Sequence, residues 1–527
     1  MKYVFFKGSR QIVHAQSLWL FTLLMAVLVT TVLIAVPFAI AAGTVTNCAD
    51  YSGAGGLEEA LTTGGKITFA CEGNIIVAPE ISISTNTVID ATDRNVTLSG
   101  GNINRVIRVE SFATLDLINI KISNGFHSTW GGGIYILEGS TVTLSNSTVS
   151  ANKADWGGGI FNRGTVILTN STVSGNEASE LGGGIYNAFN TLNLTNSTVS
   201  GNTGDGIANR SGATATLTNS TVFGNTQNGD GGGIYNDYDG TVTLINTTVS
   251  GNEGNGWGGG VMNFATVILS NSTVYGNKAG GSGGGIANVY SGTVTMTNSI
   301  IADNTEVNIN AGDCVGTITS NGHNLDSDGT CNLTKPNDLP STDPLLGEFT
   351  DDGSPGRGHL PLLEDSPAID NGDDAACLPT DQLENFRVDG DGDGVIVCDI
   401  GAIEFLPAYI EVQIDIKPGS YPNSINLKSK GKVPVAILTT GDFDAYYVDP
   451  VSCEFAGAYP IRWHIKDVDQ DGDHDMLFHF ITQELELNKD STEATIECET
   501  FEGMQIVGTD SVNIVPKNMT GTKKFKN

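Results

Sequence analysis

Basic residues are scarce in this chain of 527 residues, which has 26 lysines and arginines against 59 aspartates and glutamates and a net charge of −33 at pH 7. Three of the basic residues, Lys2, Lys7 and Arg10, lie at the very start. A chain this acidic is not expected to bind nucleic acid or an anionic membrane through charge. It is suited to a secreted, soluble protein with sites for divalent cations.

Cysteine is absent from the repetitive centre of the chain, and no two cysteines have C-x-x-C spacing, which disfavours metal–thiolate and redox chemistry. In an exported chain, an even number of cysteines indicates disulfides. Nearest-neighbour pairing is our hypothesis, because spacing alone does not fix connectivity. The four pairs would be Cys48–Cys71, Cys314–Cys331, Cys377–Cys398 and Cys453–Cys498. The seven histidines are scattered, and no Ser/His/Asp or metal–histidine arrangement is present.

Residues 130–304 repeat one short pattern seven times: T-V-T-L-x-N-S-T-V-S-G-N, a variable loop, then G-G-G-I-Y-N. A fixed period of 23 to 27 residues predicts a solenoid. Each repeat contains three short runs in which apolar and polar residues alternate, as in Thr141-Val142-Thr143-Leu144, and this leaves no room for helices or hairpins. Each coil must therefore wind round once and stack in parallel on the previous one, which is a parallel β-helix with three strands per coil.

Three columns of asparagine mark the corners of the predicted coils. Asparagine tolerates left-handed backbone geometry, and its amide can bond to the asparagine stacked above it. We expect amide ladders in all three columns, although the first column also matches N-S-T or N-T-T glycosylation acceptors. The columns are Asn146, Asn170, Asn196, Asn219, Asn246, Asn271 and Asn298; Asn152, Asn176, Asn202, Asn225, Asn252, Asn277 and Asn304; and Asn162, Asn187, Asn209, Asn236, Asn263 and Asn288.

Residues 1–42 have the features of a targeting segment: basic residues, an apolar run over residues 18–36, and a small-residue cleavage site at Ala39-Ile40-Ala41. The run is also long enough for an uncleaved transmembrane helix that would anchor the protein in the membrane. Signal peptide and signal anchor both remain open, and in either case the rest of the chain is exported. Residues 43–125 are expected to form an N-terminal cap and the first coils, with a short helix at residues 57–61 over the open end.

The repeat continues over residues 126–345 and gives way to a Cys- and Asp-rich end module at residues 346–406. The module contains S-P-A-I-D-N-G, D-G-D-G-D-G and C-D-I-G-A-I-E-F. This succession resembles the bacterial right-handed parallel β-helix proteins with a choice-of-anchor Q domain, over roughly residues 50–405. The G-G-G-I-Y-N and S-G-N units are similar to the repeats of polymorphic outer-membrane proteins, whose barrel strands this chain lacks. The resemblance implies a pectin-lyase-like fold and a surface or secreted scaffold.

Residues 407–517 change character: glycine repeats stop, and several alternating strands with turns between them predict a small β-sandwich. The run I-D-I-K-P-G-S resembles a C-terminal module of many bacterial secreted proteins, and this resemblance supplies a boundary rather than a function. Residues 518–527 are a polar basic tail that we expect to be disordered.

The sharpest chemical motif is an acidic loop with the spacing D-x-D-x-D-G-x-x-D. Alternate carboxylates in a tight loop suit a hard cation, and we expect structural Ca²⁺ there, as in dockerin-type or thrombospondin-type loops. Its alternative is a solvated acidic turn. The ligands would be Asp467, Asp469, Asp471, Asp473 and Asp475. A looser candidate is Asp389, Asp391 and Asp393, where Asp399 is the one downstream carboxylate that matches.

An aromatic stripe is expected on the strands that follow the triple glycines, in a column that we take to be exposed and stepped by about 4.8 Å per coil. Its residues are Tyr135, Phe161, Tyr186, Ala208, Tyr235, Met262 and Ala287. Stacked rings can bind sugars or a partner protein, and the alternative is ordinary strand propensity. Trp130, Trp156 and Trp257 would either line a glycan groove beside the stripe or pack over the corner.

These observations predict an exported, all-β scaffold of about ten coils that recognises a glycan or a surface protein without catalysis. The alternative is a polysaccharide lyase or glycoside hydrolase, which would need clustered carboxylates or calcium with a basic residue. The acidic residues of the repeats lie in variable loops and share no strand column with a base, although Arg163 and Arg210 could approach a sugar acid. Ice binding through a threonine column is a third class, disfavoured because T-x-T is interrupted in three coils.

Overall fold

The structure is a computed structural model that describes residues 41–62, 65–307, 312–392, 395–407, 409–440, 443–501 and 503–515. The predicted targeting run of residues 18–36 and the predicted disordered tail lie outside the described residues. Within the described ranges, no helix is both long enough and apolar enough to cross a membrane.

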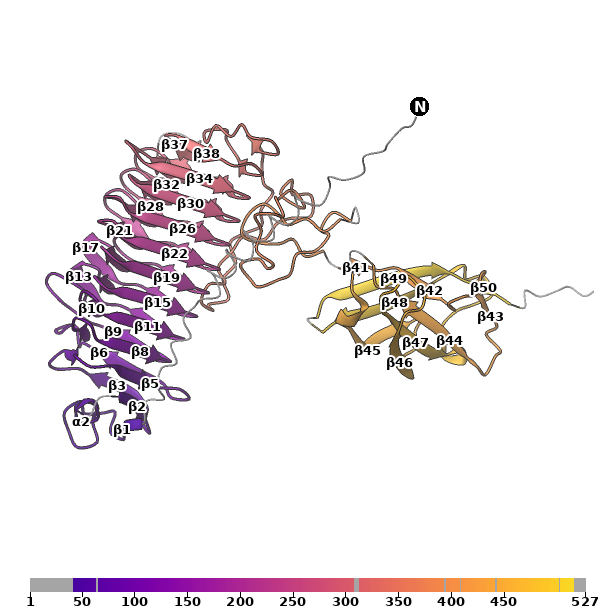
Figure 1. Ribbon diagram of the computed structural model, residues 1–527, viewed down its shortest axis with the longest axis horizontal. Helices are drawn as coiled ribbons and strands as arrows, with labels where there is room; N and C mark the ends of the chain where they lie inside the picture. Colours follow the sequence, from indigo (N-terminus) through magenta and orange to yellow (C-terminus); the bar gives the residue numbers. More distant parts are fainter. Residues whose placement is uncertain are drawn as a thin grey trace, which may run out of the picture.

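Three long parallel sheets form the walls of a β-helix, and each coil contributes one strand to each wall (Figure 1). The first sheet contains β1 (Ala41–Val45), β2 (Gly65–Phe69), β5 (Thr87–Asp90), β8 (Thr114–Ile118), β11 (Thr141–Ser145), β15 (Thr165–Thr169), β19 (Thr191–Thr195), β22 (Thr214–Thr218), β26 (Thr241–Ile245), β30 (Thr266–Ser270), β34 (Thr293–Thr297) and β38 (Ile318–Ser320).

The second sheet contains β3 (Gly73–Ile76), β6 (Val96–Ser99), β9 (Ile120–Ser123), β12 (Thr148–Ser150), β16 (Thr172–Ser174), β20 (Thr198–Ser200), β23 (Thr221–Phe223), β27 (Thr248–Ser250), β31 (Thr273–Tyr275), β35 (Ile300–Ala302), β39 (Leu325–Asp326) and β40 (Leu339–Pro340). The third sheet contains β4 (Ile81–Ile83), β7 (Ile107–Val109), β10 (Ile134–Ile136), β14 (Ile160–Asn162), β18 (Ile185–Ala188), β21 (Ile207–Arg210), β25 (Ile234–Asn236), β29 (Val261–Asn263), β33 (Ile286–Asn288) and β37 (Cys314–Val315).

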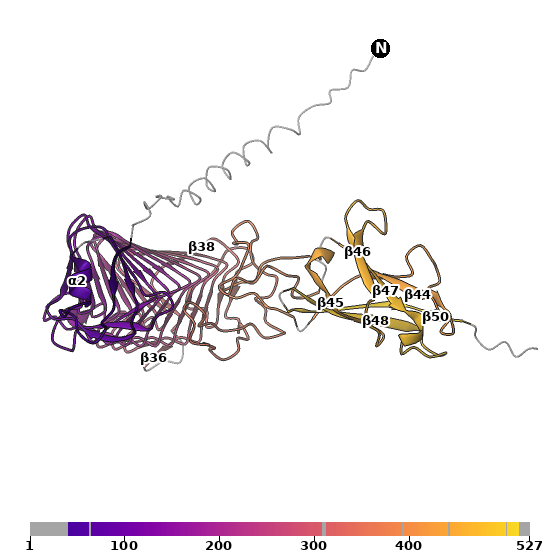
Figure 2. The same cartoon turned by 90° about the horizontal axis from the view of Figure 1, so that it is seen from below.

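The register confirms the prediction from alternation. Val142 pairs with Val166 and Leu144 with Leu168, so each apolar column stacks on itself from coil to coil. All four side chains are 0% exposed. Burial of one such side chain contributes about 1.5–3 kcal/mol, and the columns recur in every coil. The stack therefore forms one continuous apolar core. Figure 2 views the stacked coils from the end that carries the N-terminal helix.

Two of the three asparagine columns form the predicted ladders. In the second column, Asn176 Nδ2 donates to Asn202 Oδ1 at 3.0 Å, and in the third, Asn187 Nδ2 donates to Asn209 Oδ1 at 2.8 Å. The prediction was wrong for the first column, whose members take left-handed corners, such as Asn146 with φ 50°, and bond to one another only between Asn246 and Asn219. Asn146 is exposed, so burial does not exclude its N-S-T sequence as a glycosylation acceptor.

The N-terminal end of the stack is covered as expected. Helix α2 (Leu57–Leu61) packs against β1 and buries Leu57 and Ala60. All four predicted disulfides are confirmed: Cys48–Cys71 and Cys314–Cys331 near the two ends of the β-helix, Cys377–Cys398 in the segment that follows it, and Cys453–Cys498 in the C-terminal domain.

The segment of residues 346–406 does not cap the end of the stack, as an end module would, but runs back along the outer side of the second sheet (Figure 1). Its Gln382 donates to Thr221 Oγ1 at 3.1 Å and accepts from Thr248 Oγ1 at 2.6 Å. Asp373 N donates to Asn298 Oδ1 at 2.8 Å, and Gly356 N donates to Thr198 Oγ1 at 2.8 Å. Thr198, Thr221 and Thr248, on the outer side of the second sheet, are therefore buried beneath this segment.

The C-terminal domain is the predicted β-sandwich. One sheet contains β41 (Ile410–Glu411), β49 (Gln505–Ser511), β48 (Glu493–Thr500) and β45 (Val448–Phe455); the other contains β42 (Ile414–Ile416), β44 (Lys432–Ile437), β47 (Asp475–Ile481) and β46 (Arg462–Lys466). A third pair is β43 (Ser424–Ile425) with β50 (Asn513–Ile514), and two 3₁₀ turns are η1 (Ala445–Tyr447) and η2 (Thr482–Glu484). The two larger sheets share a core around Phe455, Phe478 and Phe480.

Candidate functional site

The predicted aromatic stripe is not an exposed face, so that expectation was wrong. Tyr135 is 6% exposed and Phe161 is 7% exposed, while Tyr186 and Tyr235 are half-buried. Tyr135 lies beneath the guanidinium of Arg105, 4.9 Å from its ring centre, and Arg105 itself is paired with Glu80 at 2.7 Å. The column is also interrupted by the buried residues Ala208, Met262 and Ala287.

The variable loops fold over this column and form short strands of their own: β13 (Lys153–Trp156), β17 (Glu177–Leu181), β24 (Thr226–Gln227), β28 (Glu253–Gly254), β32 (Lys278–Ala279) and β36 (Thr305–Glu306). Two of the predicted ligand-binding tryptophans contact the rings of this column, and Trp130 is nevertheless 45% exposed. Trp130 lies 6.0 Å from the rings of both Tyr135 and Phe161, and Trp156 lies 5.5 Å from Tyr186. Trp257 is 44% exposed and lies over Gly281 of the next coil.

The aromatic column is broken at Ala208, and the space beside it is occupied by polar groups. Arg210 pairs with Asp237 at 3.2 Å, and the Tyr235 hydroxyl donates to the same carboxylate at 3.3 Å. Asp205 is fully buried and accepts from Gly182 N at 2.9 Å. Burial raises the pKa of Asp205 to about 8. Asp205 Oδ1 and Arg210 Nε are buried without a hydrogen-bond partner, and the fully buried Asp205 carboxyl is closed to a ligand.

Exposed rings occur instead at the corner between the third and first sheets, on residues that the sequence reasoning did not select. We call this column the corner ridge. Its members are Phe112, Arg163, Phe189, Arg210, Tyr238, Phe264 and Tyr290, one from each coil except that of β10 and β11, which has Gly139 at this corner. Four of the rings are among the most exposed large side chains of the described chain: Phe112 at 81%, Phe189 at 60%, Tyr238 at 62% and Tyr290 at 94%. The signal in the sequence was an aromatic residue or arginine at the end of a third-sheet strand or up to three positions after it, in all but one of these coils.

The same four aromatic residues have left-handed backbone geometry, with φ of 67° at Phe112, 72° at Phe189, 48° at Tyr238 and 53° at Tyr290. This geometry costs roughly 1–2 kcal/mol for a residue with a Cβ. Other coils place glycine at the corner, for example Gly139 with φ 75°. Folding alone would favour glycine or asparagine here, and strained backbone geometry is typical of functional positions.

The two arginines of the ridge lie against its rings. The Arg210 guanidinium is 4.7 Å from the centre of the Tyr238 ring, and that of Arg163 is 5.8 Å from the centre of Phe189. Phe264 and Tyr290 stack with a centroid distance of 5.7 Å. Arg163 is half-buried and forms no ion pair among the described residues, so its donors are available to a ligand. The ridge thus offers flat apolar faces beside a planar donor group.

The predicted calcium loop at residues 467–475 joins β46 to β47, and its five carboxylates converge. Oxygens of Asp467, Asp469 and Asp475 lie within 4.8 Å of one another, as do those of Asp469, Asp471 and Asp473. Asp473 Oδ1 is buried and has no hydrogen-bond partner. Desolvation and the neighbouring carboxylates raise the pKa of Asp473 to about 6. The donor set is all oxygen and fits a hard cation, and Asp475 also accepts from Thr439 N at 2.9 Å.

The second acidic loop is assembled differently from the prediction. Asp389 and Asp391 meet Asp370, which the sequence reasoning missed, with oxygens within 4.8 Å of one another. Asp370 Oδ2 accepts from Asp391 N at 2.7 Å, and its Oδ1 is buried without a partner. Asp393 lies outside the described residues. Asp399 belongs to a different network, in which it accepts from Asp370 N at 2.7 Å and burial beside Glu404 raises its pKa to about 8.

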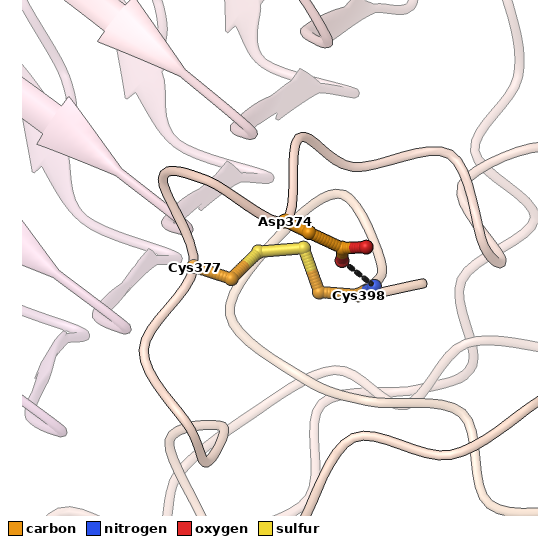
Figure 3. Close-up of side chains that lie close together, drawn as sticks. All are labelled: Asp374, Cys377 and Cys398. Atoms are coloured by element: carbon orange, nitrogen blue, oxygen red, sulfur yellow. Dashed lines mark hydrogen bonds between the residues drawn. A yellow bond between two sulfur atoms is a disulfide. The ribbon is translucent and has the colours of Figure 1, made fainter. Parts of the chain in front are cut away.

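A third group, Asp374 with Cys377 and Cys398, has the spacing of a metal site but not its chemistry (Figure 3). The two sulfurs are bonded to each other, and the Asp374 carboxylate accepts from Cys398 N at 2.9 Å. Sulfurs in a disulfide are not thiolate ligands. This group therefore has a structural role: the disulfide and its neighbours hold this segment against Asn298 of the first asparagine column.

The comparisons with known proteins agree with this fold. The family model for a right handed beta helix region matches residues 66–230. The stack is a right-handed β-helix. No curated protein and no solved structure gives a significant match to the chain. The resemblances to choice-of-anchor Q proteins and to a secreted C-terminal module stay predictions.

Proposed function

We propose that this chain is an exported, non-catalytic recognition scaffold that binds a glycan along the corner ridge of the β-helix. The observation that carries the proposal is a row of exposed rings held in left-handed geometry, with arginines between them. Export is supported by four disulfides, which persist in oxidising compartments, and by the targeting features of residues 1–42.

A glycan suits the ridge better than a protein does. The rings stand on separate coils, and arginine corners separate Phe112, Phe189 and Tyr238 from one another, while Phe264 and Tyr290 stack directly, so the ridge is not one continuous apolar patch. A stable protein interface normally has a packed apolar centre and buries more than about 1,000 Å². Sugar rings have flat CH faces that stack on aromatic rings, and their hydroxyl or carboxylate groups can accept from Arg163.

The lack of catalysis is inferred from the state of the acidic groups near the ridge. Glycoside hydrolysis needs two accessible carboxyl groups about 5–10 Å apart, one of which holds a proton. Asp205 is fully buried, and Asp237 is engaged by Arg210 and Tyr235. Asp239, beside Tyr238, is exposed, so the inference rests on the state of Asp205 and Asp237 and is tested by the activity assay below. A lyase or hydrolase is the function that a positive activity assay would establish instead.

Ca²⁺ in the loop of residues 467–475 would have a structural role in this function. The loop lies between two paired strands of the C-terminal sandwich, far in sequence from the ridge. A bound cation would neutralise the converging carboxylates and fix the turn. Removal of calcium is therefore expected to lower the stability of the C-terminal domain without changing glycan contacts at the ridge.

The test is a glycan array with the purified full-length chain, in calcium and in chelator, with retention and released reducing sugar both measured. Positive glycans are then titrated against Tyr238→Ala and against Tyr459→Ala, a control of equal exposure (62% and 63%) on the C-terminal domain. Loss of one stacked ring should cost roughly 0.5–1.5 kcal/mol, which is about twofold to tenfold in Kd. Equal effects of the two substitutions would refute the ridge as the site, and sugar release would refute the non-catalytic function.

A further inference from the structure

Three aspartates converge inside the C-terminal end of the β-helix, away from both predicted calcium loops. Asp313 precedes β37, Asp326 ends β39 and Asp328 follows two residues later. Their carboxylate oxygens lie within 4.8 Å of one another. Asp313 and Asp326 are 0% exposed. Asp326 and Asp328 belong to the sequence D-S-D-G in the irregular part of the repeat, and Asp313 lies thirteen residues before it, so spacing alone does not connect the three.

Asp313 occupies the next position of a buried asparagine ladder. Asn304 donates to Asp313 Oδ1 from its backbone N at 3.1 Å and from Nδ2 at 2.8 Å, as Asn277 donates to Asn304 at 2.9 Å. In every earlier coil, the ladder asparagine accepts with Oδ1, and its second terminal atom, Nδ2, donates to a strand carbonyl, as Asn304 Nδ2 does to Val274 O. In Asp313 this atom is an oxygen, which accepts from Ser327 N and Oγ at 3.0 and 2.6 Å.

The neighbouring carboxylates have spare acceptor capacity and no cationic side chain. Asp326 Oδ1 accepts from Gly329 N, while Asp326 Oδ2 is buried with no hydrogen-bond partner. Asp328 Oδ2 accepts from Asp313 N at 3.1 Å. None of the three forms an ion pair with lysine or arginine among the described residues. Like charges held together in a buried place cost several kcal/mol unless something neutralises them.

We propose that Asp313, Asp326 and Asp328 bind one hard divalent cation of the calcium class, which closes the C-terminal end of the β-helix. The donors are carboxylate oxygens, the ligands that such cations prefer, and the fully buried Asp326 carboxylate that meets the other two has an oxygen, Oδ2, with no hydrogen-bond partner. Asp313 directly precedes Cys314 of the Cys314–Cys331 disulfide, and Asp326 and Asp328 lie within the segment that this disulfide closes. Cation and disulfide together would hold the final coils, which have no further coil to stack on.

The alternative explanation of the same geometry is a proton shared between the buried carboxyl groups. Burial and nearby carboxylates raise the pKa of both Asp313 and Asp326 to about 6, because a negative charge on either group is disfavoured in this place. The two explanations differ in one measurable quantity, the number of calcium ions that each chain binds. They are also independent of glycan binding, because the cluster is buried and contacts no member of the corner ridge.

The experiment counts bound calcium by equilibrium dialysis with radioactive Ca²⁺ at pH 7.5, using the full-length chain. Asp313→Asn restores the ladder residue of the preceding coils and should therefore fold, and Asp326→Asn removes the unpartnered oxygen. Asp365→Asn makes the same change at an exposed carboxylate outside every cluster and serves as the control.

We expect each of the two cluster variants to bind one calcium ion fewer than the wild type, and the control to bind the same number. The thermal midpoint of the wild-type β-helix should also rise on calcium addition by more than that of Asp313→Asn. If Asp313→Asn binds as many ions as the wild type, the proposal is overturned and the shared proton is the better explanation. If Asp326→Asn does not fold, the Asp313→Asn result alone decides.

Discussion

The asparagine ladder of the second column gives the sharpest quantitative prediction for stability. Asn225 is 0% exposed and forms four side-chain hydrogen bonds. Its Oδ1 accepts from Asn202 N at 3.0 Å and from Asn202 Nδ2 at 2.8 Å. Its Nδ2 donates to Val199 O at 3.0 Å and to Asn252 Oδ1 at 2.9 Å. Asn225→Ala removes all four bonds from the middle of the stack.

The expected loss of stability depends on which hydrogen bonds the partners of Asn225 keep in the variant. Asn252 Oδ1 still accepts from the backbone N of residue 225, and Asn202 Nδ2 still donates to Val173 O. Asn202 N loses its acceptor. Each hydrogen bond contributes about 1 kcal/mol to stability, and a buried group left unpaired costs more. We therefore expect Asn225→Ala to lower the free energy of opening these coils by about 4 kcal/mol. Asn146→Ala, in the exposed first column, should cost only about 1 kcal/mol through its left-handed backbone.

A β-helix is a repeat structure whose coils can open separately, so a single unfolding midpoint reports a change in stability but does not show which coils a substitution destabilises. Native-state hydrogen exchange is the better assay, with opening free energies compared for strands β20 and β23. The reasoning is refuted if Asn225→Ala lowers these free energies by less than about 1 kcal/mol, or by no more than Asn146→Ala does. Asn225→Asp should be at least as damaging, since it keeps the accepted bonds but loses both donors and buries a charge.

Three further predictions concern other parts of the chain. Burial raises the pKa of Asp205 to about 8, so the stability that its protonated form contributes is fully present below about pH 4 and is lost as pH rises through 8. The urea midpoint of the wild type should therefore fall between pH 5 and 9, and Asp205→Asn should reduce this fall. An equal fall in the variant would contradict the prediction. Gln382→Ala should expose residues 346–406 to limited proteolysis faster than the exposed control Gln413→Ala does, because Gln382 also donates to Gly356 O and Gly358 O at 2.8 Å; equal cleavage rates would refute this anchoring role. Calcium at a hundredfold excess over its Kd should stabilise the C-terminal domain by about 2.7 kcal/mol and raise its thermal midpoint. Asp469→Asn should abolish this rise, and the prediction fails if the calcium response of the variant is unchanged.

The fold could be predicted from the sequence because its signals are local and repeated. The period-two columns, such as Val142 stacked on Val166, require strands, and the fixed period requires that they stack in register. The disulfides were predictable for a similar reason: each joins cysteines close in sequence, as Cys48 and Cys71 are. The calcium-type loop was found because all five of its carboxylates lie within nine residues, so the chain itself brings them together.

The ligand surfaces could not be predicted in the same way. Whether Tyr135 is exposed depends on where Trp130 and Arg105 lie, and those residues reach it through a variable loop and an earlier coil. The period-two pattern of a strand distinguishes its two faces but does not indicate what covers the outer one. The corner ridge escaped notice because its rings sit at different offsets from the repeat, in corners of unequal length.

The sequence by itself determined the β-helix, the pairing of its columns, the disulfides and the position of the C-terminal sandwich, because each depends on contacts that one short pattern specifies. Only the tertiary structure decided which outer faces stay open, since residues 346–406 return over Thr198, Thr221 and Thr248 of the second sheet and the variable loops cover the aromatic column. It also brought Asp370 to Asp389, and Asp313 to Asp326, from positions that no spacing rule connects. Burial and convergence of charge are properties of the packed chain, and these properties define the candidate sites.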